Sequence, residues 1–301
     1  SGTRLLAGES KTFTITTEFD INAISIPEDP VKELIITLNY IQDDGQSLTP
    51  SDPVIPVPTL VDIILEDNVA KNDTNIDFSK TSEEDGTKGL YYTNTNTEDG
   101  KTVYYYRGAV ENNYVKFAGF YWRIIRVNED GSVRLIYQGE SIDATGSETT
   151  IGDSVFNNDT DDNAYIGYMY GFVLSNNYDS THTNVNDSTI KIMLDNWYRT
   201  NLFDYASYIA DSGFCGDRSV ASAAQTWDPT DTALGYEQYV TYYGAINRMF
   251  NIFQPQYKCP QSEDLYTMYG KGNNMLSYPI ALITVDEVIY AGGNASNVNS
   301  L

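Results

Sequence analysis

Oxygen-bearing side chains that could bind a metal ion gather most densely between Asn157 and Asn163. Asp159, Asp161 and Asp162 follow one another closely there. Calcium takes about six to eight oxygen ligands from carboxylates, amides and backbone carbonyls, and a loop rich in Asp and Asn can supply them. The spacing is not that of an EF-hand, because no glycine turn and terminal glutamate follow in register. The stretch therefore predicts calcium at these aspartates, with a solvated loop as the alternative.

Two tyrosines, Tyr168 and Tyr170, follow this acidic stretch directly. Tyrosine is unusually abundant, at 25 residues against 11 Phe. An aromatic ring with a polar tip offers a large, rigid surface suited to protein or sugar contacts. We therefore predict Tyr168 and Tyr170 as ligand-binding residues. Core packing is the alternative, as it is for the other tyrosine groups.

The chain has a single histidine, His182, within the polar run Ser180–Thr183. Triad catalysis needs a base beside a nucleophile, oriented by a third group, and nothing in the sequence pairs His182 with such residues. Among 42 acidic residues no carboxylate pair for glycoside hydrolysis can be singled out. The sequence therefore predicts an ordinary loop histidine, no catalytic residue and a protein that is not an enzyme. A hydrolase is kept as a third option.

The two cysteines, Cys215 and Cys259, form an even pair. In an extracellular chain such a pair predicts a disulfide first. A metal site would want more Cys or His nearby, and a catalytic cysteine would want a histidine partner. Closing this loop would stabilise the fold by roughly 4 kcal/mol in the chain-entropy model.

Composition separates the plausible partners from the implausible ones. The net charge is −24, with 18 basic and 42 acidic residues, which argues against nucleic acid because polyanion binding needs a Lys/Arg footprint. The charge favours divalent cations and cationic partners, or simply a well-solvated surface. No apolar run has the length of a transmembrane helix. The abundance of Tyr, Asn, Asp, Ser and Thr predicts a secreted, cell-surface protein.

A proline-rich stretch at 43–58 divides the chain. It carries four prolines and favours an extended, semi-rigid linker. Before it, residues 1–42 show strand-like alternation, but two or three strands are marginal alone. After it, residues 59–301 form the larger predicted domain. We therefore expect an α+β protein with a β-rich N-terminal segment and a larger mixed domain.

The strongest local signal in the larger domain is a hairpin. Its two apolar strands, 120–127 and 133–138, flank the turn Asn128–Gly131, where Asp-Gly favours positive φ at the glycine. Trp122, Ile124, Ile125, Leu135 and Tyr137 are its predicted core residues. Further strands are expected at 89–93, 102–107 and 114–118.

Helices are predicted at three main places. Thr59 can cap a short helix with Leu60, Ile63 and Ile64 on one face. The stretch 188–202 places Ile190, Met193, Leu194, Trp197 and Tyr198 at helical spacing, with Ser188 as N-cap. A further helical stretch covers about 235–250. Tyr278–Ile283 predicts a buried strand, and Thr284–Glu287 then forms a capping box that opens a helix stopped by Gly292.

Several motifs in this domain resemble those of a family of uncharacterised secreted or surface proteins of Gram-positive, often gut-dwelling, bacteria. They are KFAGFYWRIIRVNEDGSVRLIYQG at 116–139, DDNAYIGYMYG at 161–171, TIKIMLDNWYRTNL at 189–202, GFCGDRS at 213–219, YKCP at 257–260 and YPIALITVDEVIYAGG at 278–293. The resemblance covers roughly 59–301. It implies that Cys215 and Cys259 sit in paired motifs, and a fold similar to the C-type-lectin-like or sulfatase-modifying-factor-like fold. Family members continue with a Trp-Thr-Met-Ser-Pro segment and a Gly-Val-Arg-Pro-Val ending, so the resemblance implies a truncated or cleaved chain.

The N-terminal segment resembles a different family. SGTRLLAGESKTFTITTEFD and ELIITLNYIQDDG, within 1–45, are similar to the end of the Ig-like sandwich of TasA/camelysin-type secreted proteins. Some TasA-like proteins assemble into extracellular fibres by strand donation. The resemblance therefore implies possible self-assembly through residues 1–42.

These observations together predict a non-catalytic, extracellular cell-surface protein for binding or adhesion. Its expected partner is a host or environmental glycan or protein. The alternative is a structural subunit of an extracellular fibre or pilus, assembled through the N-terminal strands.

Overall fold

The computed structural model divides the chain into two compact units, Ser1–Pro56 and Val57–Leu301. It describes residues 58–158, 163–173, 178–221 and 243–293, all in the second unit. The boundary between the units falls inside the proline-rich stretch. The predicted N-terminal segment 1–42 and the linker up to residue 57 lie outside the described residues. None of the described helices is long and apolar enough to cross a membrane.

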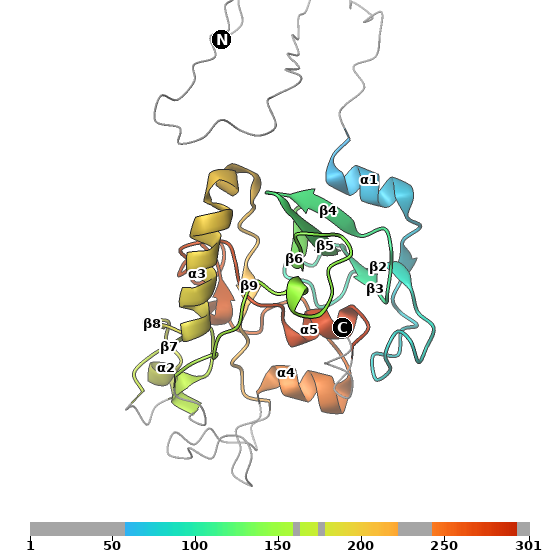
Figure 1. Ribbon diagram of the computed structural model, residues 1–301. Coiled ribbons are helices and arrows are strands. Elements are labelled where there is room, and N and C mark those ends of the chain that lie inside the picture. The colour runs from blue at the N-terminus through green and yellow to red at the C-terminus, as the bar shows by residue number, and fades with distance from the viewer. Residues whose placement is uncertain (1–57, 159–162, 174–177, 222–242, 294–301) are drawn as a thin grey trace, which may run out of the picture. The chain divides into compact units, whose positions relative to one another are not determined.

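The main element of the second unit is a six-stranded sheet (Figure 1). Its strands are β1 (Lys71–Asn72), β2 (Gly89–Thr93), β3 (Val103–Arg107), β4 (Tyr114–Phe117), β5 (Phe120–Val127) and β6 (Val133–Gly139). All pairs are antiparallel except β1 with β2. β3 and β4 pair with opposite ends of β5, while β6 pairs along nearly its whole length. The sheet and its helices confirm the α+β class.

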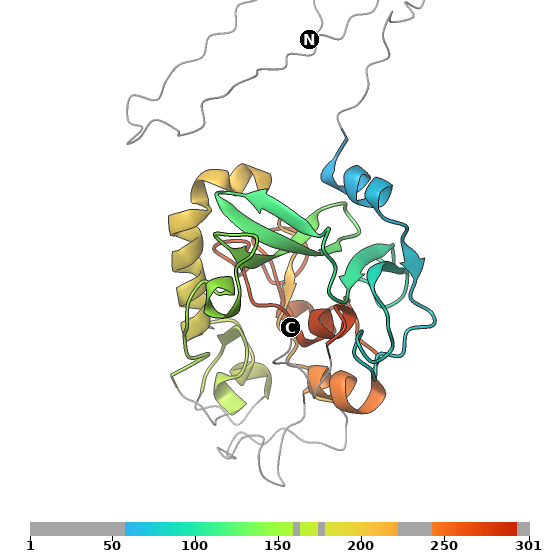
Figure 2. The same ribbon diagram turned by 45° about the vertical axis from the view of Figure 1, so that its right-hand side comes forward.

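Short elements and helices surround this sheet. The helices are α1 (Leu60–Asp67), α2 (Tyr178–Thr181), α3 (Thr189–Asn201), α4 (Gly244–Asn247) and α5 (Val285–Tyr290), with 3-10 turns at Gly146–Thr149, Asn163–Tyr165, Phe203–Tyr208 and Ser262–Asp264 and a π turn at Arg248–Ile252. Two small antiparallel pairs join β7 (Met169–Tyr170) to β8 (Asn186–Asp187), and β9 (Phe214–Cys215) to β10 (Leu265–Tyr266). In both views α5 lies between the sheet and α4 (Figures 1 and 2).

The β5–β6 hairpin forms as predicted. Gly131 has φ +83° and donates its N–H to the carbonyl of Asn128 at 3.0 Å. Trp122 and Ile124 are buried, whereas Ile125 is only partly buried. A register irregularity between Ile124 and Arg126 disturbs the simple alternation there. The hairpin therefore supplies both a core and a fixed register for the residues that flank its turn.

Helix α3 also follows the prediction. The Ser188 side chain accepts a hydrogen bond from the N–H of Lys191, which caps the helix. Leu194 and Tyr198 are buried, and Tyr198 packs in one cluster with Trp122 of β5. Burial of this apolar stripe holds α3 against the hairpin.

The sheet has two different faces because successive side chains of a strand point to opposite sides. Leu90 contacts the α1 residue Ile64, while its neighbour Tyr91 belongs to a cluster with Tyr105 and the α5 residue Tyr290. Helix α5 thus packs on the face opposite to α1. The first turn of α5 is thereby held close to the sheet.

Three predictions needed correction. Tyr278–Ile283 forms no strand, and Leu282 and Ile283 are exposed, so the prediction of a buried strand was wrong. Within the described part of 235–250, the helix is only α4 and the start of a π turn. On α1 the predicted face was only partly right: Ile64 is buried and Val61 and Leu65 pack beside it, whereas Leu60 and Ile63 are exposed.

Candidate functional site

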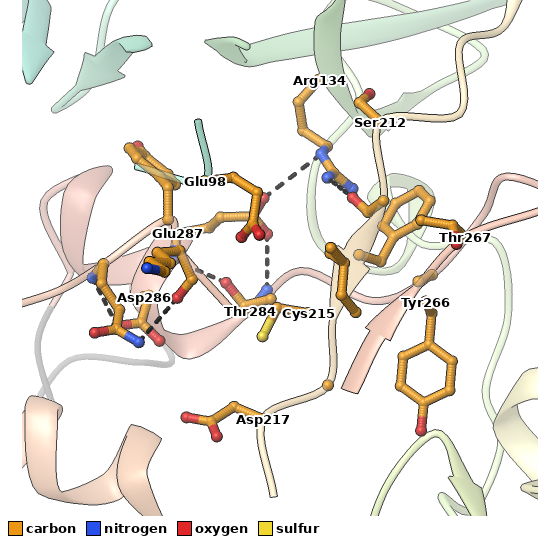
Figure 3. A pocket seen from close by; sticks show the side chains of 18 of the residues that line it. Glu98, Arg134, Ser212, Cys215, Asp217, Tyr266, Thr267, Thr284, Asp286 and Glu287 are labelled. Carbon is orange, nitrogen blue, oxygen red and sulfur yellow. Dashed lines mark hydrogen bonds and ion pairs between the residues drawn. The ribbon is translucent and has the colours of Figure 1, made fainter. Parts of the chain in front are cut away.

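A pocket of about 560 Å³ opens where the sheet, the β9–β10 pair and the beginning of α5 meet (Figure 3). Arg126 and Arg134 line it from the hairpin, and Glu287 lines it from α5. Exposed apolar side chains, among them Tyr269 and Leu282, also line it. The pocket therefore combines a charged interior with apolar surface, which is typical of ligand sites.

Two arginines on neighbouring strands share one carboxylate in this pocket. Arg126 and Arg134 are register partners in the β5–β6 pair, and like charges directly opposite destabilise a sheet. Glu287 Oε1 lies 3.3 Å from Arg126 Nη1 and 3.6 Å from Arg134 Nε (Figure 3). Burial alone would raise the pKa of Glu287, but the two guanidinium groups and Thr284 outweigh it and hold that pKa below its usual range.

The position of Glu287 is fixed by the local sequence. The Thr284 hydroxyl accepts the N–H of Glu287 at 3.1 Å, and the Glu287 carboxylate accepts the N–H of Thr284 at 2.9 Å. This is the capping box predicted for the start of α5. One carboxylate therefore both caps the helix and bridges it to the sheet.

Each arginine of the pair lies over an aromatic ring. Arg126 stacks over Tyr257 at 4.6 Å and Arg134 over Phe214 at 4.0 Å. Burial, and next the charge of Arg126, lower the pKa of Arg134 to about 10. Arg134 is 9% exposed, and its Nε makes no hydrogen bond. These ion pairs set two guanidinium groups against the one carboxylate of Glu287, while the carboxylates of Glu98, Glu129, Asp130 and Asp211 also line the pocket.

Three more buried ion pairs surround the pocket. Arg248 contacts Asp286 at 2.7 Å and Asp217 at 2.6 Å. Arg218 Nε donates to Asp264 Oδ1 at 2.7 Å. Asp217 and Arg218 are neighbours in the sequence. Each is in an ion pair, but with a distant partner rather than with its neighbour.

The predicted disulfide between Cys215 and Cys259 is present. It joins β9 to the segment after the π turn, and Cys215 lines the pocket. The cross-link therefore fixes one wall of the site.

The other predicted site residues do not all line this pocket. Tyr168 lines the pocket but is buried, and its hydroxyl donates to the carbonyl of Ile280 at 3.0 Å. Tyr170 does not line the pocket, and its ring packs at a tilt against that of Tyr165, with the ring centroids 5.1 Å apart. The proposed calcium ligands Asp159, Asp161 and Asp162 lie outside the described residues. Within the described ranges, no group of three or more His, Cys, Asp and Glu side chains could hold a metal ion.

His182 is buried rather than solvated. Its ring stacks on Tyr178 at 3.9 Å, and Nδ1 lies 2.9 Å from the Tyr178 carbonyl oxygen. Burial, opposed only in part by that backbone contact, lowers the pKa of His182 to about 4. The imidazole is therefore neutral in the folded protein at pH 7.

The buried imidazole predicts a loss of stability in acid. Since the folded pKa of about 4 lies below the ordinary 6.5, the unfolded chain binds the proton first as the pH falls between these values. The free energy of unfolding should fall in that window by at most about 3 kcal/mol on account of this group. Urea unfolding from pH 7 to 4 of the native protein and of His182→Gln measures it. A difference between the two that stays constant with pH would contradict the prediction.

Comparison of the chain with known family models, curated proteins and solved structures finds no match. The site must therefore be judged from its own geometry. The sequence predicted Glu287 only as part of a capping box, and it did not single out Arg126, Arg134 or Glu287 as site residues. The hairpin register does hold a signal, because Arg126 and Arg134 are each one residue away from the strand ends Val127 and Val133 that pair next to the turn.

Proposed function

We propose that this protein is a non-enzymatic, extracellular binding protein and that the 560 Å³ pocket is where it takes its ligand. The observation that carries the proposal is the pocket itself. Its volume lies within the usual range of ligand sites, and it offers apolar contact surface beside a fixed set of charges.

The state of the charges favours binding over catalysis. Glu287, Asp286 and Asp217 are each held by an arginine, and Asp264 is held by Arg218. General acid–base catalysis needs a group that can exchange a proton near the working pH, and the lowered pKa of Glu287 makes that carboxylate unsuited to this role. Such fixed charges suit the recognition and orientation of a ligand.

The disulfide supports the extracellular part of the proposal, because disulfides persist in oxidising compartments. The C-type-lectin-like and Ig-like identities, and adhesion to a host or environmental glycan or protein, rest on the sequence motifs. Fibre assembly through residues 1–42 is the alternative, and negative-stain electron microscopy of the native protein would reveal regular fibres if it holds.

The binding proposal is tested by arrays of glycans and of extracellular-matrix proteins, probed with the native protein. Tyr269→Ala removes an exposed aromatic ring from the pocket, and binding should fall by at least about 10-fold. Phe203→Ala is the matched control, because Phe203 is also an exposed aromatic but does not line the pocket. No binding to either array, or equal loss in both variants, would reject the pocket as the site.

A further inference from the structure

Three consecutive residues beside the pocket leave their backbone unpaired. Within the described residues, neither the N–H nor the carbonyl groups of Ala281, Leu282 and Ile283 make a hydrogen bond. The segment is held at both ends instead: the Ile280 carbonyl accepts the Tyr168 hydroxyl, and Thr284 caps α5. It is therefore fixed in place while its own hydrogen-bonding groups stay free.

The composition of Ala281–Ile283 is typical of a strand. The segment also lacks the residues that normally protect the open edge of a sheet from pairing with another chain. Ala281, Leu282 and Ile283 are apolar, and all three line the pocket. Leu282 is 41% exposed and Ile283 39%. Natural edge strands are normally protected by charges, prolines or bulges, and this segment has neither a charged residue nor a proline. Although the segment belongs to no sheet, its unpaired backbone groups can pair with another backbone.

The arginine pair Arg126 and Arg134 lines the same pocket as the segment. Thr284, which follows Ile283, is hydrogen-bonded to Glu287, and Glu287 is the single anion shared by Arg126 and Arg134. A chain lying along 281–283 would thus run toward an arginine pair that can take a second carboxylate.

We propose that the pocket takes an extended polypeptide segment of a partner protein, which pairs with Ala281–Ile283 as an added strand and places a carboxylate against Arg126 and Arg134. The inference rests on the proposed binding function and narrows its ligand to a peptide. Repeated N–H and carbonyl groups along an extended segment are matched by another backbone, because main-chain hydrogen bonds give strand addition its affinity. The carboxylate is a C-terminus or an Asp or Glu side chain.

The peptide probe is a phage-displayed library of random heptapeptides with free C-termini, selected on the full chain. Selected peptides are then synthesised with a single N-methyl group at each position in turn. In a strand, N–H groups that face the partner alternate with those that face away. Binding measured by isothermal titration calorimetry should therefore fall by at least about 10-fold at every second position and change little between them. Equal effects at all positions, or at none, would overturn strand addition.

The protein side is tested with a matched pair of variants. Leu282 and Ile246 are each 41% exposed, but Ile246 lies on α4 and does not line the pocket. Leu282→Lys should weaken a selected peptide by at least about 10-fold, while Ile246→Lys should leave its affinity within about 2-fold. Thermal unfolding of both variants checks that they remain folded. Amide hydrogen exchange at residues 281–283 should slow when the peptide is bound.

The contact between the peptide carboxylate and the arginine pair is tested separately. Amidating the C-terminus, or replacing acidic residues of a selected peptide by amides, should weaken binding and reduce its dependence on salt. Peptides that bind equally well without any carboxylate would overturn the role given to Arg126 and Arg134.

A glycan or a second copy of the chain in the pocket would give different results in these experiments. Glycan binding that depends on Tyr269, with no selected peptide, would overturn the peptide inference and leave the binding function standing. If Leu282→Lys abolishes self-association seen by light scattering, and no peptide competes, the occupant is a second copy of this chain and the partner-protein proposal is wrong.

Discussion

Replacing Asp264 with alanine should lower the free energy of unfolding by about 3–5 kcal/mol. Asp264 and Arg218 are both almost fully buried, and Asp264 accepts hydrogen bonds from the Arg218 Nε and backbone N–H, each at 2.7 Å. The remaining donors of Arg218 bond to the carbonyl of Met169 and the amide oxygen of Asn184. Removing the carboxylate leaves a buried guanidinium with no counter-charge, and this is the physical origin of the loss.

Two further variants test whether the loss of stability comes from the unpaired guanidinium or from a general sensitivity of the fold to substitution. The double variant Arg218→Met, Asp264→Leu removes both charges, and it should lose less stability than the single alanine variant. Lys80→Met breaks the exposed pair of Lys80 with Asp77, 3.6 Å apart, and should cost less than about 1 kcal/mol. Urea unfolding monitored by tyrosine and tryptophan fluorescence measures all three. A double variant that is less stable than the single one would show that the pair stabilises the fold in its own right.

Removing the Cys215–Cys259 disulfide is expected to lower the free energy of unfolding by about 4 kcal/mol. The bond closes a loop with a sequence separation of 44, and its absence gives the unfolded chain more freedom. Because Cys215 lines the pocket, the same change should loosen that wall and weaken any ligand bound there.

The native protein reduced with dithiothreitol is the control for the double variant Cys215→Ser, Cys259→Ser. Reduction opens the cross-link but keeps the buried sulfur of Cys259, whereas the serine variant also changes the packing. Similar losses in both would assign the effect to the cross-link. A loss below about 1 kcal/mol in the reduced protein would refute the loop-closure account.

The elements that could be predicted from the sequence are those specified by neighbouring residues. The β5–β6 hairpin follows from Asp130-Gly131 between two apolar runs, and α3 follows from Ser188 and an apolar stripe at helical spacing. The capping box of α5 likewise depends only on the four consecutive residues Thr284–Glu287. Each signal acts over a few positions, so local conformational preference suffices to produce it.

The sequence by itself also determined the disulfide, because only two cysteines can pair with each other. It did not determine whether Tyr278–Ile283 pairs as a strand. A continuous run of apolar residues favours a buried strand, but a strand needs a partner at its edge, and the described fold brings none to Ala281–Ile283. The tertiary structure thus left open the groups on which the proposed peptide contact depends.

Only the tertiary structure decided the composition of the site. Arg126 and Arg134 meet Glu287 more than a hundred residues further along the chain, and Tyr168 turns out to be held by Ile280. Local patterns carry no information about such contacts, because burial and ion pairing depend on which surfaces the folded chain brings together. The sequence therefore determined the local elements and the cross-link, while the fold determined which charges share a pocket and which backbone groups remain free.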